Sequence, residues 1–222
     1  MKNNAYKIAV VVTLLVFAVV GAFVYMNSGS QTAGSQSSDQ PSIEGQPTMG
    51  NTDSPVQVVE FGDFKCPSCK AWGEMIYPQL VSDYVDTDKI SFSYVNVLFH
   101  GQESELASLA AESIYKMDPD SYWDFQKKLY EEQPAQNHDA VWVTNEKLLE
   151  VAAETTDVDL AQLEEELNNA TMADEVAIDT ELVEQFDVAF TPSIIVNGTM
   201  LEDPFDYEAI KALIDEGLEE NE

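Results

Sequence analysis

The chain has few basic residues and few side chains that bind transition metals. Its 222 residues include no arginine, ten lysines, two histidines and two cysteines, against 41 aspartates and glutamates, which gives a formal charge of −31. Because nucleic-acid binding relies on basic side chains that neutralise phosphates, we expect no nucleic-acid partner. Such an acidic surface is either simply solvated or suited to a saline exterior, where salt screens its self-repulsion.

The apolar content is sufficient for a folded domain. Hydrophobic residues make up 45% of the sequence and aromatic residues 10%. These fractions are typical of globular proteins and exclude a disordered acidic tail. The length is that of one domain once segments without apolar patterning are set aside.

The N-terminal part has the pattern of a membrane anchor. Lys2 and Lys7 precede an uncharged, apolar run over 8–25, which is about long enough to span a bilayer as a helix. The positive-inside rule places residues 1–7 in the cytoplasm and the part of the chain after the run outside it. A cleaved signal peptide is the alternative, although no small-x-small site directly follows the run. Residues 26–54, rich in Ser, Gln and Gly, predict a flexible linker.

The remaining segment, 55–219, has the pattern of an α/β domain with a helical insertion. Short β-rich runs alternate with stretches of helical periodicity, and Asn197-Gly198 suits the turn of a hairpin. The expected elements are a strand at 56–61, a helix from Cys66 to about Tyr84, a strand at 90–97, a helical insertion at about 102–186, a strand at 193–196 and a helix at 206–218.

The two cysteines form the motif Cys66-Pro67-Ser68-Cys69, directly after a predicted strand and at the start of a predicted helix. A helix N-terminus presents free N–H groups and partial positive charge, which stabilise a thiolate and lower its pKa. Cys66 is therefore the candidate nucleophile. Cys69, one turn later, can attack a mixed disulfide formed at Cys66. Pro67 suits the first helical turn.

Three other interpretations of the cysteines are weaker. A structural disulfide would close a loop of two intervening residues and would remove little chain entropy. A zinc site needs two more ligands, whereas the only histidines, His100 and His138, lack metal-ligand spacing. Two unrelated buried thiols do not account for the strand-turn-helix context. We therefore expect no metal at this motif.

Three charged residues near the motif have two interpretations each. Lys65 and Lys70 either lower the pKa of a neighbouring thiol or are ordinary surface lysines. Glu60, inside the first strand, either points to solvent or is buried beneath the motif. In the buried case its pKa would be raised, and it could exchange a proton with Cys69.

The segment Val58 to Lys70, VVEFGDFKCPSCK, resembles the active-site segment of DsbA-like thiol-disulfide oxidoreductases, and most closely the BdbD type of Gram-positive bacteria. Residues 122–130, YWDFQKKLY, resemble an aromatic helix in that family's insertion. Residues 190–198, FTPSIIVNG, resemble its cis-proline strand. The resemblance extends from about residue 50 to the C-terminus.

The resemblance implies a thioredoxin fold with an inserted helical domain. It implies Cys66 as nucleophile, Cys69 as resolving thiol, Glu60 as a buried acid and a cis Thr191–Pro192 bond beside the redox pair. Pro192 is then a catalytic residue, whereas Thr191, Pro67 and Ser68 are candidate substrate contacts.

No cofactor is expected, although the resemblance leaves calcium open because some BdbD-type proteins carry it. Asp118, Asp120 and Asp124 could bind it, but no EF-hand loop is present, and helix capping is the alternative role for these aspartates.

The resulting hypothesis is an extracytoplasmic disulfide oxidase, anchored in the cell membrane. Its substrates would be reduced exported proteins, and a quinone-linked membrane protein of the DsbB or BdbC type would reoxidise it. A low pKa at Cys66 stabilises the dithiol and makes the disulfide oxidising. The alternatives are a reductase or isomerase of the same fold, or a holdase that does not use its thiols.

Overall fold

The computed structural model describes residues 40–137 and 140–221, which are built around a five-stranded sheet of order β1-β3-β2-β4-β5. Strands β2 and β3 are parallel and the other neighbours are antiparallel. The strands are β1 (Thr48–Gly50), β2 (Gln57–Gly62), β3 (Ser91–Asn96), β4 (Ser193–Val196) and β5 (Thr199–Met200). The predicted strands and the hairpin are confirmed. Asn197 and Gly198 both have positive φ, as a tight hairpin turn requires.

The helices follow the predicted order. A helical segment over 67–85 connects β2 with β3, four α-helices and a 3-10 turn form the insertion, and two further helices flank β4 and β5. They are α2 (Pro67–Met75), α3 (Tyr77–Leu80), the π-helical η1 (Val81–Val85), α4 (Gln102–Met117), the 3-10 turn η2 (Pro119–Ser121), α5 (Tyr122–Glu131), α6 (Asn145–Thr155), α7 (Leu160–Asn169), α8 (Ala173–Gln185) and α9 (Tyr207–Glu219).

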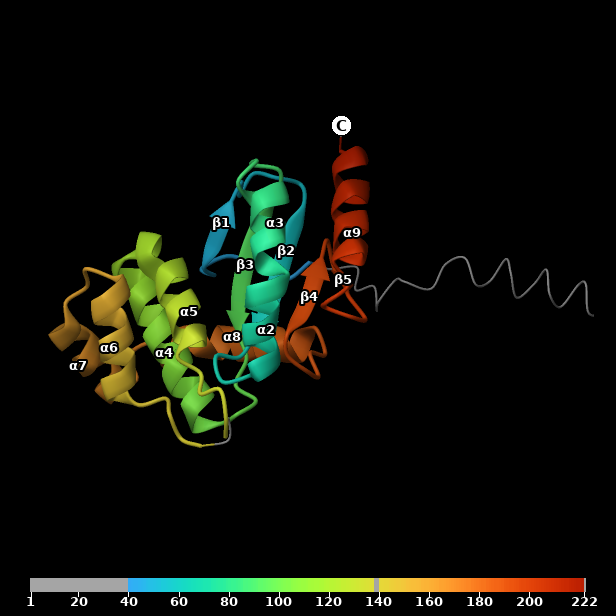
Figure 1. The fold of residues 1–222 in the computed structure, drawn as a ribbon. Coiled ribbons are helices and arrows are strands. Elements are labelled where there is room, and N and C mark those ends of the chain that lie inside the picture. Colours follow the sequence, from blue (N-terminus) through green and yellow to red (C-terminus); the bar gives the residue numbers. More distant parts are fainter. Residues whose placement is uncertain (1–39, 138–139, 222) are drawn as a thin grey trace, which may run out of the picture.

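Both faces of the sheet are covered by helices. On one face Val58 and Phe92 pack in a cluster with Trp72 of α2 and with α9. On the other face Phe61 packs with Phe186, which directly follows α8. Figure 1 shows α2 and α3 in front of the strands and α8 behind them. The central strands are therefore buried on both sides, so their residues do not alternate between buried and exposed.

Helices α4 to α7 form the predicted insertion at one side of the sheet (Figure 1). Their cluster includes Ile114, Phe125, Leu148 and Leu163, all fully buried. The same cluster contains both cysteines, so the redox pair lies where the insertion meets the sheet layer. The helical stretch predicted to end at about residue 186 includes α8, which packs against both the insertion and the sheet. Val176 belongs to the insertion cluster, whereas Leu182 packs on the sheet.

The predicted linker over 26–54 extends too far toward the C-terminus. Strand β1 pairs antiparallel with β3, Gln46 is buried, and the Gln57 side chain donates a hydrogen bond to the Pro41 carbonyl. A three-residue edge strand is too short to show a hydrophobic period, which is why composition alone indicated a linker. The predicted anchor, 8–25, lies outside the described residues. Within 40–137 and 140–221, no helix combines the length and apolar character needed to cross a membrane.

Candidate active site

The Cys66–Cys69 motif lies where β2 passes into α2. Cys66 is the N-cap residue of α2, and Pro67 occupies the first helical position, where a missing N–H has no cost. Cys66 is 7% exposed and Cys69 is fully buried, whereas Pro67 and Ser68 are exposed. Both cysteines are free thiols in this structure. Of the two cysteines, only Cys66 retains any exposure.

The two thiols have opposite pKa shifts. A hydrogen bond from the Cys69 thiol lowers the pKa of Cys66 to about 5, with further help from the backbone N–H groups of Cys69 and Ser68, and together these outweigh burial. Burial raises the pKa of Cys69, and the hydrogen bond to Cys66 and the charges of Cys66 and Glu60 act in the same direction. At neutral pH Cys66 is thus a thiolate and Cys69 a protonated thiol.

The two flanking lysines are engaged elsewhere. Lys65 is buried and forms an ion pair with Glu103, whose second carboxylate oxygen accepts the N–H groups of Trp142 and Val143 at 2.8 and 3.0 Å. Lys70 donates to the Glu131 carbonyl at 3.2 Å. Neither interpretation from the sequence describes Lys65, because it is not a surface lysine and its charge is matched by Glu103. Lys65 instead ties the cysteine loop to the segment before α6.

Glu60 is buried, which decides between its two interpretations. Its side chain is 4% exposed, and burial together with the nearby Cys66 charge raises its pKa well above the usual value. Glu60 lines a cavity of about 490 Å³ with Lys70, Tyr77, Gln126 and other residues of α2, α3 and α5. A buried carboxyl with a raised pKa beside a redox-active cysteine has the properties of a proton carrier.

The loop before β4 completes the site. The Thr191–Pro192 peptide bond is cis, as the resemblance implied, and Pro192 is buried. Cys66 Sγ lies 3.4 Å from the Thr191 carbonyl oxygen, so residues 125 positions apart in sequence are in contact. Thr191 itself is partly exposed. The structure therefore places Thr191, Pro67 and Ser68 at the accessible side of Cys66.

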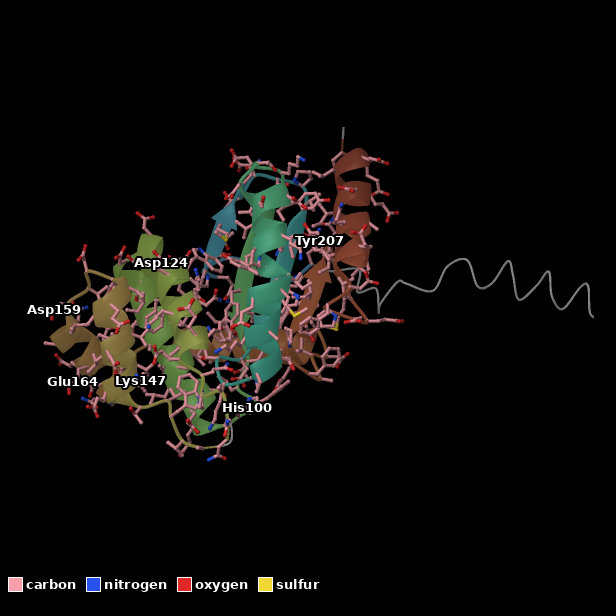
Figure 2. The ribbon with its side chains drawn as sticks, viewed as in Figure 1. His100, Asp124, Lys147, Asp159, Glu164 and Tyr207 are labelled. Carbon is pink, nitrogen blue, oxygen red and sulfur yellow. The ribbon has the colours of Figure 1, made fainter. Side chains whose placement is uncertain are left out.

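Asp63 is a site residue that sequence analysis missed. It is fully buried, and its carboxylate accepts the Lys65 backbone N–H at 2.8 Å, His100 Nδ1 at 2.8 Å and the Ser104 hydroxyl at 2.9 Å. Its own N–H lies 3.5 Å from Cys69 Sγ. Figure 2 shows His100 at the end of the molecule where α2 begins. Asp63 therefore holds the turn between β2 and the motif; its position directly after the strand was the available signal.

Gln133 is a second missed residue. Its buried side-chain amide donates to the carbonyls of Phe64 at 2.7 Å and Cys66 at 3.1 Å. It follows α5, so the insertion fixes the backbone of the nucleophile directly. No local pattern indicates this role, because the contact spans 67 positions.

A buried polar cluster lies elsewhere, between β3, α4 and α8. The Asn96 side-chain amide donates to Glu112 and Asp179, both at 2.7 Å, and Gln46 donates to Asp179 at 2.7 Å. Burial and the Asp179 charge raise the pKa of Glu112 to about 8, and burial raises that of Asp179 to about 6. The side-chain oxygens of Gln46 and Asn96 have no hydrogen-bond partner among the described residues.

The three aspartates that the sequence offered as calcium ligands do not converge. Asp120 and Asp124 are exposed, and the Asp118 carboxylate accepts the Ser121 hydroxyl at 2.6 Å. Asp124 lies on the helical part of the molecule, away from His100 (Figure 2). In the described part of the chain no three His, Cys, Asp or Glu side chains form a group that could hold a metal ion.

Comparison with known proteins identifies the family. A family model described as thioredoxin matches residues 42–216. The chain belongs to the thioredoxin family. It is 43% identical over 192 residues to disulfide bond formation protein D of Bacillus subtilis, covering 86% of each chain. It is 32% identical to the probable disulfide bond formation protein D of Bacillus anthracis, covering 97% of each.

Solved structures agree with this assignment. The crystal structure of oxidised BdbD from Bacillus subtilis superposes with a TM-score of 0.78 at 42% identity, covering 86% of this chain and all of that one. DsbA of Chlamydia trachomatis shares the fold, with a TM-score of 0.68 at 20% identity, covering 82% of this chain and 94% of that one. With its paired cysteines, this thioredoxin-family chain is a thiol-disulfide oxidoreductase of the DsbA-like, BdbD type.

Proposed function

We propose that the chain is a disulfide oxidase, which accepts electrons from the thiols of exported proteins. The observation that carries this proposal is the pair of opposite pKa shifts, with Cys66 lowered to about 5 and Cys69 raised. A stabilised thiolate favours the dithiol over the disulfide. The Cys66–Cys69 disulfide is therefore readily reduced by substrate thiols, which form a disulfide in the substrate.

The reaction follows from the accessibility of the two sulfurs. A substrate thiolate attacks Cys66 Sγ of the disulfide, the bond to Cys69 breaks, and Cys69 Sγ leaves as a thiolate that takes up a proton. A second substrate thiolate then attacks the substrate sulfur of the mixed disulfide, which expels Cys66 as a thiolate. The substrate has lost two electrons, and Cys66 and Cys69 have gained two. Since Cys69 is fully buried, attack begins at Cys66.

Glu60 supplies and removes the proton of Cys69 in this proposal. Its raised pKa lets it carry a proton near neutral pH, and its charge state is coupled to both cysteines. Pro192 and Thr191 would border the substrate at Cys66, with the exposed Pro67 and Ser68 on the opposite side. These roles rest on the 3.4 Å distance between Cys66 Sγ and the Thr191 carbonyl oxygen and on the exposure of Pro67 and Ser68.

The cellular setting is part of the proposal. The apolar run at 8–25 would anchor the chain as a single-pass membrane protein, with the catalytic domain on the extracytoplasmic side. A quinone-linked membrane protein of the DsbB or BdbC type would return the pair to the disulfide. The names of its relatives, which refer to disulfide bond formation, support the oxidising direction.

A single-turnover assay tests the direction of electron flow. We expect the oxidised full-length chain, mixed with an equal amount of a reduced unfolded protein, to remove about two substrate thiols per chain, because its disulfide is the less stable one. A variant with both cysteines changed to serine should remove none. If the oxidised chain left the thiols intact while the reduced chain cleaved substrate disulfides, the chain would be a reductase. If neither redox form exchanged thiols and the serine variant kept a chaperone-like activity of the chain, the chain would be a holdase.

We also propose that the buried polar cluster binds calcium. Glu112 and Asp179 supply carboxylates, and Gln46 and Asn96 supply amide oxygens that lack other partners among the described residues. Calcium prefers such oxygen ligands. A bound cation would neutralise two carboxylates that otherwise cost free energy when ionised in a buried site. Its role would be structural, since the cluster joins β3 to α4 and α8.

Thermal unfolding checks this proposal. With Glu112 and Asp179 raised in pKa, the calcium-free protein should lose stability as pH rises from about 4 to 8. Calcium at a hundredfold excess over its dissociation constant adds about 2.7 kcal/mol, or roughly 5–10 °C in Tm. We expect this gain at pH 8 and a smaller one at pH 5. Asp179→Asn should remove it and Asp118→Asn should retain it; equal gains in both variants would exclude the cluster.

A further inference from the structure

Two tyrosines form a buried pair where the insertion meets the sheet. Tyr94 of β3 and Tyr130 of α5 have their hydroxyl oxygens 2.7 Å apart, and their side chains are 0% and 8% exposed. Phe64 packs against both rings, with centroid distances of 5.5 and 5.3 Å. The pair is thus held in place from three segments: the loop before Cys66, the sheet and the insertion.

The pair lies beside Glu60. In the parallel β2–β3 register Tyr94 is the partner of Glu60, so the two side chains leave the same face of the sheet. Tyr94 also lies against Gly62, where an added Cβ would come within 2.6 Å of the hydroxyl. Tyr130 and Glu60 line the same cavity. The two hydroxyl groups therefore lie between β3, where Tyr94 is the neighbour of Glu60, and the cavity that Tyr130 and Glu60 both line.

A count of protons shows what the pair can donate. Two hydroxyl groups carry two protons, and only one of these can lie between the two oxygens. Among the described residues, neither hydroxyl has a second protein partner. The Glu60 carboxyl also has no hydrogen-bond partner in the described part of the chain. No hydrogen bond joins either hydroxyl to Glu60 in this structure. A free hydroxyl proton and a carboxylate without other partners nevertheless attract one another across the cavity that they share, because each left unpaired in a buried site costs free energy.

Other ionisable groups near Glu60 are less suited to this role. Lys70 is committed to the Glu131 carbonyl, and the Tyr77 hydroxyl donates to the Met49 sulfur at 3.2 Å. The Tyr122 hydroxyl is buried but does not line the cavity. The titratable groups around Glu60 are Cys66, Cys69, Lys70 and Glu74 of α2, Tyr77 of α3, Asp86 after η1, Tyr94 of β3, and Tyr122, Lys127, Tyr130 and Glu131 of α5.

We infer that Tyr94 and Tyr130 are positioning residues for the transfer of the Cys69 proton, with their free hydroxyl proton turned toward the Glu60 carboxylate when that carboxylate is ionised. This inference rests on the proposed role of Glu60. During reoxidation the Cys66–partner disulfide is attacked by Cys69 Sγ, whose proton passes to Glu60. The Cys66–Cys69 bond forms, the bond to the partner breaks, and the partner leaves as a thiolate. The two tyrosines stabilise the Glu60 carboxylate whenever it does not carry the proton. The insertion thus takes part in the resolving step through Tyr130.

Ellman's reagent separates the two cysteines in time. Reduced full-length chain attacks the reagent through Cys66 and releases one thionitrobenzoate; Cys69 then attacks the resulting mixed disulfide and releases a second. In Tyr130→Phe we expect the first release to be unchanged. The second should be about tenfold slower near pH 7, with its pH midpoint raised by about one unit, because Glu60 has lost a donor to its ionised form. Tyr94→Phe should behave alike.

Two controls separate the possible failures. Tyr84→Phe removes a tyrosine hydrogen bond of 2.8 Å, to Asp215, away from the cysteines, and should leave both releases unchanged. In a Glu60→Gln background Tyr130→Phe should have no further effect on the second release. If Glu60→Gln itself leaves the pH profile unchanged, the proposed role of Glu60 fails. If Glu60→Gln alters the profile but Tyr130→Phe and Tyr94→Phe do not, the inference about the tyrosines is overturned.

Discussion

Cys69→Ala is expected to accumulate as covalent adducts with its partner proteins. The variant keeps Cys66 at the N-terminus of α2 and still attacks disulfides, although it loses the Cys69 hydrogen bond that lowers the Cys66 pKa. No buried thiol remains to resolve the mixed disulfide. Turnover should fall by about three orders of magnitude, the scale expected when a step in nucleophilic catalysis is lost. Non-reducing gels of cells that express the variant should show high-mass bands that collapse on reduction, with the linkage at Cys66 by mass spectrometry.

Cys66→Ala is the matched control for that experiment. It removes the partly accessible thiol and leaves the fully buried one, whose pKa burial raises. We expect a similar loss of turnover and few or no adducts. Equal trapping by the two variants, or adducts linked to Cys69 in the Cys66→Ala variant, would show that the nucleophile has been assigned to the wrong sulfur.

The reduced protein is expected to be more stable than the oxidised protein at neutral pH. Cys66 has a pKa of about 5 in the folded dithiol against an ordinary value of 9.0. A lowered pKa contributes stability that is complete above about pH 9 and is lost as pH falls through about 5. At pH 7 about two pKa units of this difference are realised, which is at most about 2.7 kcal/mol and corresponds to about 5–11 °C in Tm; solvent screening reduces it. The disulfide form has no thiolate and lacks this contribution.

Melting curves of the two redox forms between pH 5 and pH 8 measure this difference. The gap in Tm should widen as pH rises, and comparing the two forms cancels groups that titrate in both. Cys66→Ala cannot form the disulfide, so its Tm is compared with that of the oxidised wild-type chain. This difference should lack the pH-dependent part that reduced wild type shows. A gap that stayed constant with pH, or an oxidised form that was the more stable at pH 8, would mean that Cys66 is not a stabilised thiolate.

The chemistry of the two cysteines could be predicted because it depends on local structure. A strand, a tight turn and a helix start are all encoded within a dozen residues, and they place Cys66 at the N-terminus of α2 with Cys69 one turn later. The cis bond before Pro192 came from family resemblance, since the residues alone favour trans. The contact of Thr191 with Cys66 was likewise not available from local pattern, because 125 positions separate them.

The burial of Glu60 could not be decided from alternation. Val58, Val59, Glu60 and Phe61 are all buried, because α2 and α9 cover one face of the sheet and α8 covers the other. On a strand that is covered on both sides the period of two gives no information about exposure. Only the three-dimensional arrangement shows that Glu60 faces a cavity rather than solvent.

Sites assembled from distant segments could not be predicted from the sequence for a related reason. The aspartates at 118, 120 and 124 are close in sequence and do not converge, whereas Gln46 and Asp179, 133 positions apart, share a hydrogen bond of 2.7 Å. Their side chains meet because β1 and the segment before it pack beside β3 and α8. The same holds for Gln133 and Tyr130, which reach the redox motif only after α5 has packed against the sheet.

The reduction potential of the Cys66–Cys69 pair tests the central claim most directly. It can be measured by equilibrating the full-length chain with glutathione buffers of known potential and quantifying the two redox forms. A Cys66 thiolate stabilised to a pKa of about 5 predicts an oxidising pair, nearer to the value of about −120 mV found for strong disulfide oxidants. A potential near −270 mV, as in thioredoxin, would contradict the assignment as an oxidase.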